Sequence, residues 1–129
     1  MSHQKSKIIV LAEDDEEDVD FFKEALSEIE IDIQVTVVKN GILLIKYLET
    51  TQELPDIIFM DLNMPFKNGV QCLEEIKKVD KWKTIKTIIL STSSNKDQIE
   101  KLYELGADLY LTKPTSFNEL KRQLSECVQ

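Results

Sequence analysis

Hydrophobic residues along the chain alternate between short continuous runs and stretches of helical spacing. The continuous runs predict five strands, and the apolar stripes between them predict five helices. The predicted strands cover residues 7–12, 33–38, 56–60, 87–90 and 109–111, and the helical stripes fall within residues 19–29, 42–48, 70–79, 99–103 and 117–124. Strands that alternate with helices predict right-handed crossovers and a parallel sheet with helices on both faces.

Polar groups follow four of the five predicted strands. In parallel sheets of this kind, ligands bind beyond the carboxyl ends of the strands, at the point where the strand order reverses. The polar groups are the acidic run Glu13–Asp18 after the first strand, Asp61 after the third, Ser91–Ser94 after the fourth, and Lys113 with Pro114 after the fifth. We therefore expect these groups to converge on one edge of the sheet.

This set of residues suits phosphoryl chemistry on a carboxylate. Three carboxylates held together, from Glu13, Asp14 and Asp61, repel one another, so one takes up a proton or a cation joins them. Oxygen ligands without histidine or cysteine suit a hard ion, most naturally Mg²⁺ with Mn²⁺ as a substitute. A carboxylate can also be a nucleophile that accepts a phosphoryl group. Lys113 offers a positive charge and Ser91 a hydroxyl donor, so the sequence predicts phosphorylation of Asp61.

Composition narrows the function classes. The chain has 129 residues, 42% of them hydrophobic, which fits one compact domain. A net charge of −8 argues against nucleic-acid binding, and no apolar run is long enough to span a membrane.

The start, Met1–Lys7, lacks the form of a signal peptide, so the cytoplasm is the expected compartment. Cys72 and Cys127 are interpreted as reduced thiols, and the one histidine, His3, argues against histidine-based zinc sites, catalytic triads and histidine phosphotransfer. The run KKVDKWK, residues 77–83, is interpreted as a solvated helix end.

Four motifs together resemble those of a known family. They are IIVLAEDD (8–15), PDIIFMDLNMPFKNG (55–69), TIILSTSS (87–94) and LGADLYLTKP (105–114). In this order, on alternating strands and helices, they resemble the receiver domain of two-component response regulators over about Lys7 to Cys127. The resemblance implies an α/β fold, the flavodoxin-like doubly wound (βα)5 three-layer sandwich with parallel strand order 2-1-3-4-5. It also implies that residues 1–129 form a single receiver domain, with a core of about 7–127 and no output domain.

The resemblance implies a role for each acidic residue of the site. Asp61 would be both the phosphoacceptor and a metal ligand. Asp14 would touch the metal ion directly, and Glu13 would act mainly through water. Asn63 would give its backbone carbonyl to the metal. Within the acidic run, Asp15 is left open between a helix cap and a source of negative potential. The later acidic residues, Glu16, Glu17, Asp18 and Asp20, are interpreted as a solvated helix start.

The resemblance also implies a phosphoryl-binding and switching group. Lys113 would pair with the phosphoryl group, and its peptide bond to Pro114 would be cis. Either Ser91 or Thr92 could be the switch hydroxyl; Ser91 is favoured because it directly follows the apolar run and has the family's usual spacing to Asp61 and Lys113. Tyr110 would be the aromatic switch residue of the fifth strand, with an ordinary core position as the alternative.

The function implied is a stand-alone phosphoacceptor switch rather than a turnover enzyme. A sensor histidine kinase, of the phytochrome type or another, would phosphorylate it, and the face formed by residues 96–129 would then bind a downstream target, a phosphotransfer protein or a second copy. A phosphatase of the haloacid dehalogenase type would need an acid at Asn63. A flavin carrier would need a phosphate-binding loop where the chain is acidic. A receiver that works without phosphorylation would lack an acid, hydroxyl or lysine that this chain has.

Overall fold

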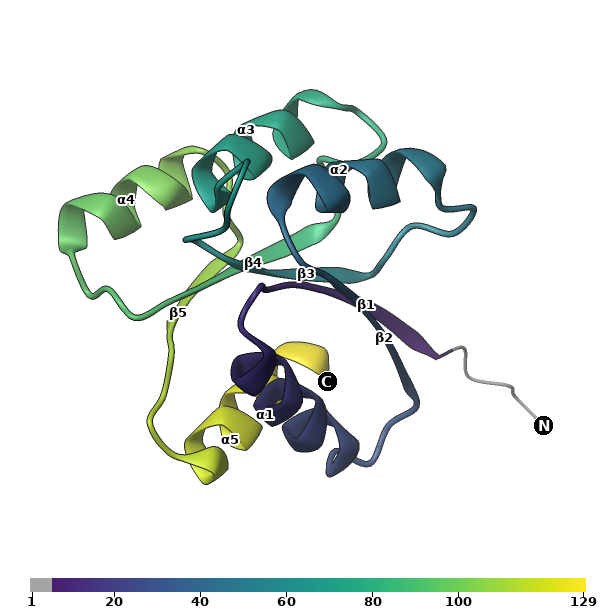
Figure 1. Ribbon diagram of the computed structural model, residues 1–129, viewed down its shortest axis with the longest axis vertical. Coiled ribbons are helices and arrows are strands. Elements are labelled where there is room, and N and C mark those ends of the chain that lie inside the picture. Colours follow the sequence, from purple (N-terminus) through teal and green to yellow (C-terminus); the bar gives the residue numbers. More distant parts are fainter. Residues whose placement is uncertain (1–5) are drawn as a thin grey trace.

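The predicted alternation of strands and helices runs through the computed structural model, which describes residues 6–129 (Figure 1). The elements are β1 (Lys7–Ala12), α1 (Glu16–Ser27), β2 (Ile33–Val38), α2 (Gly41–Thr50), β3 (Ile57–Asp61), α3 (Gly69–Lys78), β4 (Lys86–Ser91), α4 (Lys96–Glu104), β5 (Leu109–Thr112) and α5 (Phe117–Val128). Every predicted strand and helix is confirmed, with ends that differ by a few residues. His3 lies outside the described residues.

The five strands form one parallel sheet in the order β2-β1-β3-β4-β5. Helices α1 and α5 cover one face, and α2, α3 and α4 cover the other (Figure 1). The predicted three-layer flavodoxin-like architecture and its strand order are therefore confirmed. From β1 the chain passes to β2, the neighbour of β1 on one side, and then to β3, the neighbour of β1 on the other side. The switch point of the strand order therefore lies between the carboxyl ends of β1 and β3.

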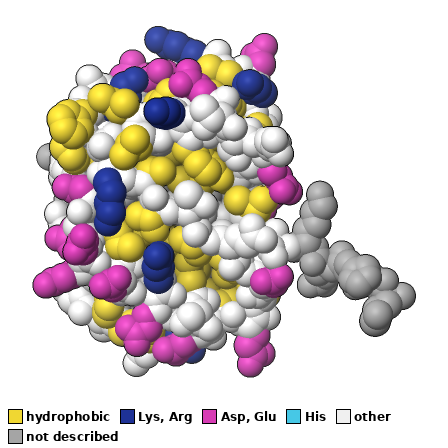
Figure 2. Space-filling model, turned by 45° about the vertical axis from the view of Figure 1, so that its right-hand side comes forward, with side chains coloured by type: hydrophobic (Ala, Val, Ile, Leu, Met, Phe, Trp, Pro, Cys, Tyr) yellow, Lys and Arg dark blue, Asp and Glu magenta, His cyan; other side chains and the backbone are white. Residues whose placement is uncertain are grey.

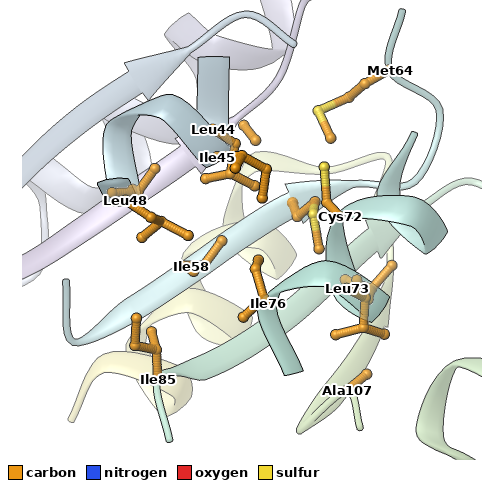
Figure 3. Packing of buried hydrophobic residues seen from close by; sticks show 14 of the residues in the cluster. Leu44, Ile45, Leu48, Ile58, Met64, Cys72, Leu73, Ile76, Ile85 and Ala107 are labelled. Carbon is orange, nitrogen blue, oxygen red and sulfur yellow. The ribbon is translucent and has the colours of Figure 1, made fainter. Parts of the chain in front are cut away.

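The central strand β3 is buried along its whole length because helices cover both faces of the sheet. On one side its residues pack against α2 and α3, where apolar side chains of the helices point toward the sheet (Figure 3). On the other side Phe59 packs against α1, and its ring meets that of Phe22 edge to face with centroids 5.0 Å apart.

Among residues 6–129, none of the helices combines the length and the hydrophobicity that a membrane span requires.

Both cysteines are buried free thiols, which confirms the prediction that they are reduced. Burial raises the pKa of the Cys72 thiol to about 11, so it stays protonated at neutral pH.

The prediction that residues 77–83 form a solvated helix end is wrong at Trp82, which is only 4% exposed. After α3 ends, the Trp82 amide donates to the Val79 carbonyl at 2.9 Å, and this turn carries the indole into the core.

A polar residue caps the start of each helix, and its side chain accepts a hydrogen bond from a backbone amide in the first turn. The caps are Asp15, Asn40, Asn68, Asn95 and Ser116. The open question about Asp15 is therefore settled in favour of a cap. At α3 the arrangement is reciprocal, because Asn68 accepts from the Gln71 amide while the Gln71 side chain accepts from the Asn68 amide, both at 2.9 Å.

Asn68→Ala is expected to lower the free energy of unfolding by about 1 kcal/mol, because the Gln71 amide loses its acceptor. Urea denaturation of the variant beside the wild type measures the change. Asn118→Ala is the matched control: Asn118 lies on the exposed side of the first turn of α5 and caps nothing. Equal losses in the two variants would contradict the role of the Asn68 cap.

Candidate functional site

Three carboxylates meet at the carboxyl ends of β1 and β3. Glu13 and Asp14 directly follow β1, and Asp61 is the last residue of β3. One oxygen from each of the three side chains lies within 4.8 Å of the others. Glu13 and Asp61 are 2% and 7% exposed, whereas Asp14 is open to solvent. The convergence that the strand ends predict is present for these residues.

Lys113 reaches the same place from the loop after β5. Its ammonium Nζ lies 2.8 Å from Glu13 Oε1 and 3.6 Å from Asp61 Oδ2. It also lies 3.0 Å from Asp18 Oδ2, on the first turn of α1. Sequence reasoning assigned Asp18 to a solvated helix start and missed this contact. The only signal was the placement of Asp18 on the helix that follows Glu13 and Asp14.

The buried charges perturb one another. Burial raises the pKa of Glu13 to about 7, and the neighbouring Asp61 adds to this while Lys113 opposes it. For Lys113, burial alone would lower the pKa, but hydrogen bonds to Glu13 and Asp18 outweigh it and hold the pKa above its ordinary value. Lys113 is therefore charged throughout the physiological range, while Glu13 titrates within it.

In protein freed of divalent ions, stability is expected to fall as pH rises from about pH 5 to about pH 8. The folded-state pKa of Glu13, about 7, exceeds its ordinary value of 4.5, so the folded protein binds the proton more tightly across this window. That contribution is complete below 4.5 and is lost as pH rises through 7. Urea denaturation in a chelating buffer at both pH values measures the slope. Glu13→Gln should flatten it, and an unchanged slope in that variant would assign the effect to another group.

The hydroxyl of Ser91 lies at the end of β4, the strand next to β3. Ser91 is fully buried, whereas Thr92 is exposed. The Ser91 Oγ accepts from the Ser93 amide at 3.1 Å, and the Tyr110 hydroxyl donates to the Ser93 carbonyl at 2.6 Å. Tyr110 is 9% exposed and lies within the core on the α4 side. Ser93 therefore links the end of β4 to β5 through both of its backbone groups.

The peptide bond between Lys113 and Pro114 is trans, and the expectation of a cis bond is wrong, since residues 6–129 contain no cis peptide. For a bond before proline, the trans form is intrinsically favoured by about 0.5–1 kcal/mol. Here the trans chain is also anchored, because the Lys113 amide donates to the Ser91 carbonyl at 2.7 Å. The Lys113 side chain still reaches Glu13 and Asp61 from this backbone.

The acidic cluster suits a hard divalent ion. All three side chains offer oxygen, two are buried, and the single positive charge of Lys113 cannot balance three carboxylates. Asn63, whose backbone carbonyl was predicted as a further ligand, lies in the exposed loop after β3. Its amide donates to Asp61 Oδ1 at 3.3 Å, which holds this loop against the carboxylate.

A sequence model of the response regulator receiver domain matches residues 9–125, almost the whole of the predicted core. The chain belongs to the response regulator receiver family. Receiver domains are the phosphoacceptor modules of two-component signalling, and phosphorylation on an aspartate with Mg²⁺ is a general feature of the family. The chain is therefore the receiver of a signalling regulator.

Several relatives resemble this receiver along most of their length. It is 34% identical to the response regulator Rcp1 of Synechocystis over 88% of the chain and 81% of Rcp1. Among solved structures, the phosphorylated cyanobacterial phytochrome response regulator RcpA is 33% identical, with a TM-score of 0.88 over 95% of this chain and 91% of RcpA. The Mn²⁺-bound form of Rcp1 is 31% identical, with a TM-score of 0.84 over 93% of this chain and 90% of Rcp1.

Proposed function

We propose that this receiver accepts a phosphoryl group on Asp61 from a sensor histidine kinase and thereby changes which proteins it binds. The observation that supports this proposal is the position of the Lys113 ammonium, 3.6 Å from Asp61 Oδ2 at the switch point of the sheet. In the transfer, an Asp61 carboxylate oxygen forms a bond to phosphorus. The bond from phosphorus to the imidazole nitrogen of the donor breaks, and its electron pair stays on that nitrogen. Lys113 is in place to balance the charge that the phosphoryl group brings.

The acidic cluster is the proposed metal site. Glu13, Asp14, Asp61 and the Asn63 backbone carbonyl would hold Mg²⁺ or Mn²⁺, and a bound ion supplies positive charge beside the phosphoryl oxygens. The Mn²⁺-bound structure of Rcp1 supports this assignment. Until an ion is bound, the close packing of Glu13 and Asp61 makes the site electrostatically unfavourable for a phosphoryl group, so metal and phosphate are expected to depend on one another.

The first test is intact mass after incubation with acetyl phosphate, with Mg²⁺ and with a chelator. We expect a phosphoryl adduct with Mg²⁺ and at least a tenfold smaller adduct when the ion is removed, because the uncompensated carboxylates repel the donor. An adduct of equal yield in the chelator would contradict the metal dependence. If no adduct forms under either condition, the protein would be a docking module that works without phosphorylation.

The response is proposed to pass through Ser93. If the Ser91 hydroxyl turns toward a phosphoryl group on Asp61, the Ser93 amide loses its acceptor, and the loop before α4 is free to move. The Tyr110 hydroxyl, which holds the Ser93 carbonyl, would then lose or change its partner. The face formed by residues 96–129 contains α4, β5 and α5 and is the proposed readout surface.

The proposed partners follow from this scheme. A histidine kinase supplies the phosphoryl group, and a downstream target or a phosphotransfer protein reads the result. The likeness to RcpA, a phytochrome response regulator, makes a phytochrome-type kinase the first donor to test. Phosphorylation and target binding are expected to occur in the cytoplasm, and neither step calls for nucleic acid.

A further inference from the structure

The Lys113 ammonium group divides its hydrogen bonds between two parts of the fold. It donates to Glu13 Oε1 at 2.8 Å, in the segment after β1, and to Asp18 Oδ2 at 3.0 Å, on α1. Its separation of 3.6 Å from Asp61 Oδ2 is an ion-pair distance that is too long for a hydrogen bond. Asp18 is therefore a full partner of Lys113, although it lies outside the acidic cluster that forms the proposed metal site.

The start of α1 holds Asp18 in this position. The Asp15 side chain, which caps the helix, accepts from the Asp18 amide at 3.0 Å. The Asp15 amide in turn donates to Glu13 Oε2 at 3.3 Å. Asp18 and Glu13 are thus linked by two routes, one through Asp15 and one through the Lys113 ammonium group. This closed ring of contacts places the Asp18 carboxylate next to Glu13 and the end of β1.

Lys113 and a divalent ion would compete for Glu13. The Glu13 side chain is 2% exposed, and the Lys113 ammonium group already occupies its Oε1. An ion held by Glu13 and Asp61 would repel the ammonium group and take over the negative charge that now attracts it. Asp18 would stay available as a partner, because its side chain is 47% exposed and belongs to α1 rather than to the cluster.

The Lys113 side chain has space to shift toward Asp18. A cavity of about 50 Å³ lies between α1 and the start of α5, and both side chains line it. Most of the remaining lining is apolar and includes Phe21, Phe22 and Leu120. A charge pair in such surroundings is screened less than one on the open surface. Asp18 can therefore hold the ammonium group without a rearrangement of α1 or α5.

We propose that Asp18 is a positioning residue that holds the Lys113 ammonium group while a divalent ion occupies the acidic cluster. In the metal-free protein, Glu13 and Asp18 share the ammonium group. When the ion binds, the ammonium group stays with Asp18, and Glu13 is released to the ion. Asp18 thereby favours metal binding without contacting the ion, and it keeps Lys113 beside Asp61. The inference rests on the proposed metal site and extends it to a residue of α1.

The test is Mn²⁺ binding to the full chain, with the free ion measured by electron paramagnetic resonance. Asp18→Asn keeps the shape of the side chain and one oxygen acceptor but removes the charge, so it should weaken Mn²⁺ binding about threefold to tenfold. Glu17→Gln is the matched control. It removes an exposed carboxylate from the same turn of α1, and none of the ion pairs of Lys113 involves Glu17. The control should change the affinity by less than about twofold.

The control is needed because the surface around α1 is acidic. Figure 2 shows mostly acidic side chains over the lower part of the molecule, which is the part where α1 lies in Figure 1. The first turn of α1 alone carries Glu16, Glu17 and Asp18. Loss of any one of these charges weakens the attraction of a cation slightly, and salt at physiological concentration screens most of that general effect. Only the part of the loss that exceeds the control is assigned to the contact with Lys113.

A Lys113→Gln background separates positioning from direct ligation. If Asp18 acts through Lys113, Asp18→Asn should weaken Mn²⁺ binding in this background no more than Glu17→Gln does. A larger loss that persists there would make Asp18 a ligand of the ion and would overturn the proposal. Equal effects of Asp18→Asn and Glu17→Gln on the otherwise unchanged chain would also overturn it, while the metal site would stand. A wild type that binds no Mn²⁺ would overturn the proposed metal site, and this inference with it.

Discussion

Asp61→Asn is expected to abolish the phosphoryl adduct that forms with acetyl phosphate and Mg²⁺. The carboxamide lacks the nucleophilic oxygen pair of the carboxylate, and it also removes one of the three acidic ligands. The side chain keeps nearly the same size and shape at a position only 7% exposed, so the fold should survive. Intact mass spectrometry of the variant beside the wild type measures the loss directly.

Asp80→Asn is the control for this experiment. Asp80 follows α3, and its side chain is 93% exposed, where it contacts Lys83 on the surface. The control should carry the adduct to the same extent as the wild type. An adduct that persists on Asp61→Asn would place the acceptor on another residue, and peptide mapping of the modified chain would then identify it.

Phe59→Ala is expected to lower the free energy of unfolding by about 3–5 kcal/mol. Phe59 is fully buried at the middle of the central strand. The substitution removes its contact with the Phe22 ring and leaves a cavity between the sheet and α1. A typical domain has a free energy of unfolding of about 5–15 kcal/mol, so the substitution would remove a large part of the stability. Urea denaturation measures the loss.

Phe66→Ala makes the same chemical change at the surface. Phe66 lies in the loop between β3 and α3 and is 81% exposed, so its removal should change stability by less than about 0.5 kcal/mol. Its backbone has a φ of 69°, but phenylalanine and alanine both carry a Cβ, so the strain changes little. If Phe59→Ala does not fold, the milder Phe59→Leu should give a measurable loss of about 1 kcal/mol. Equal effects at the two phenylalanines would contradict the burial argument.

The central strands and the acidic cluster were predictable because each depends on a local pattern with one physical meaning. A continuous apolar run such as Ile57–Met60 must be covered on both sides, and a carboxylate at its end must lie at the sheet edge. The order of the strands was different. Periodicity says which segments are strands but not which of them are neighbours, so the order 2-1-3-4-5 came from the family resemblance.

The features that the sequence did not reveal depend on packing between distant segments. Asp18 contacts Lys113, 95 residues away, because α1 packs against α5, the helix that follows Lys113 in the chain. Nothing in an acidic first turn distinguishes such a residue from a solvated one. Trp82 stands in a charged run, and its burial depends on a turn that breaks the helical period. The intrinsic preference of an X–Pro bond for the trans isomer is only about 0.5–1 kcal/mol, so local sequence does not decide the isomer of the Lys113–Pro114 bond.

The fluorescence of Trp82 can serve as an intrinsic probe of unfolding in this protein. It is the chain's one tryptophan, and its indole is shielded from water between the end of α3 and the start of β4. Its fluorescence should therefore shift to longer wavelength when the chain unfolds. The strand starts lie at the opposite end of the sheet from Asp61, so metal or phosphoryl binding should leave the emission almost unchanged. In one unlabelled sample, tryptophan fluorescence can therefore follow global unfolding, while intact mass spectrometry follows phosphorylation of the site.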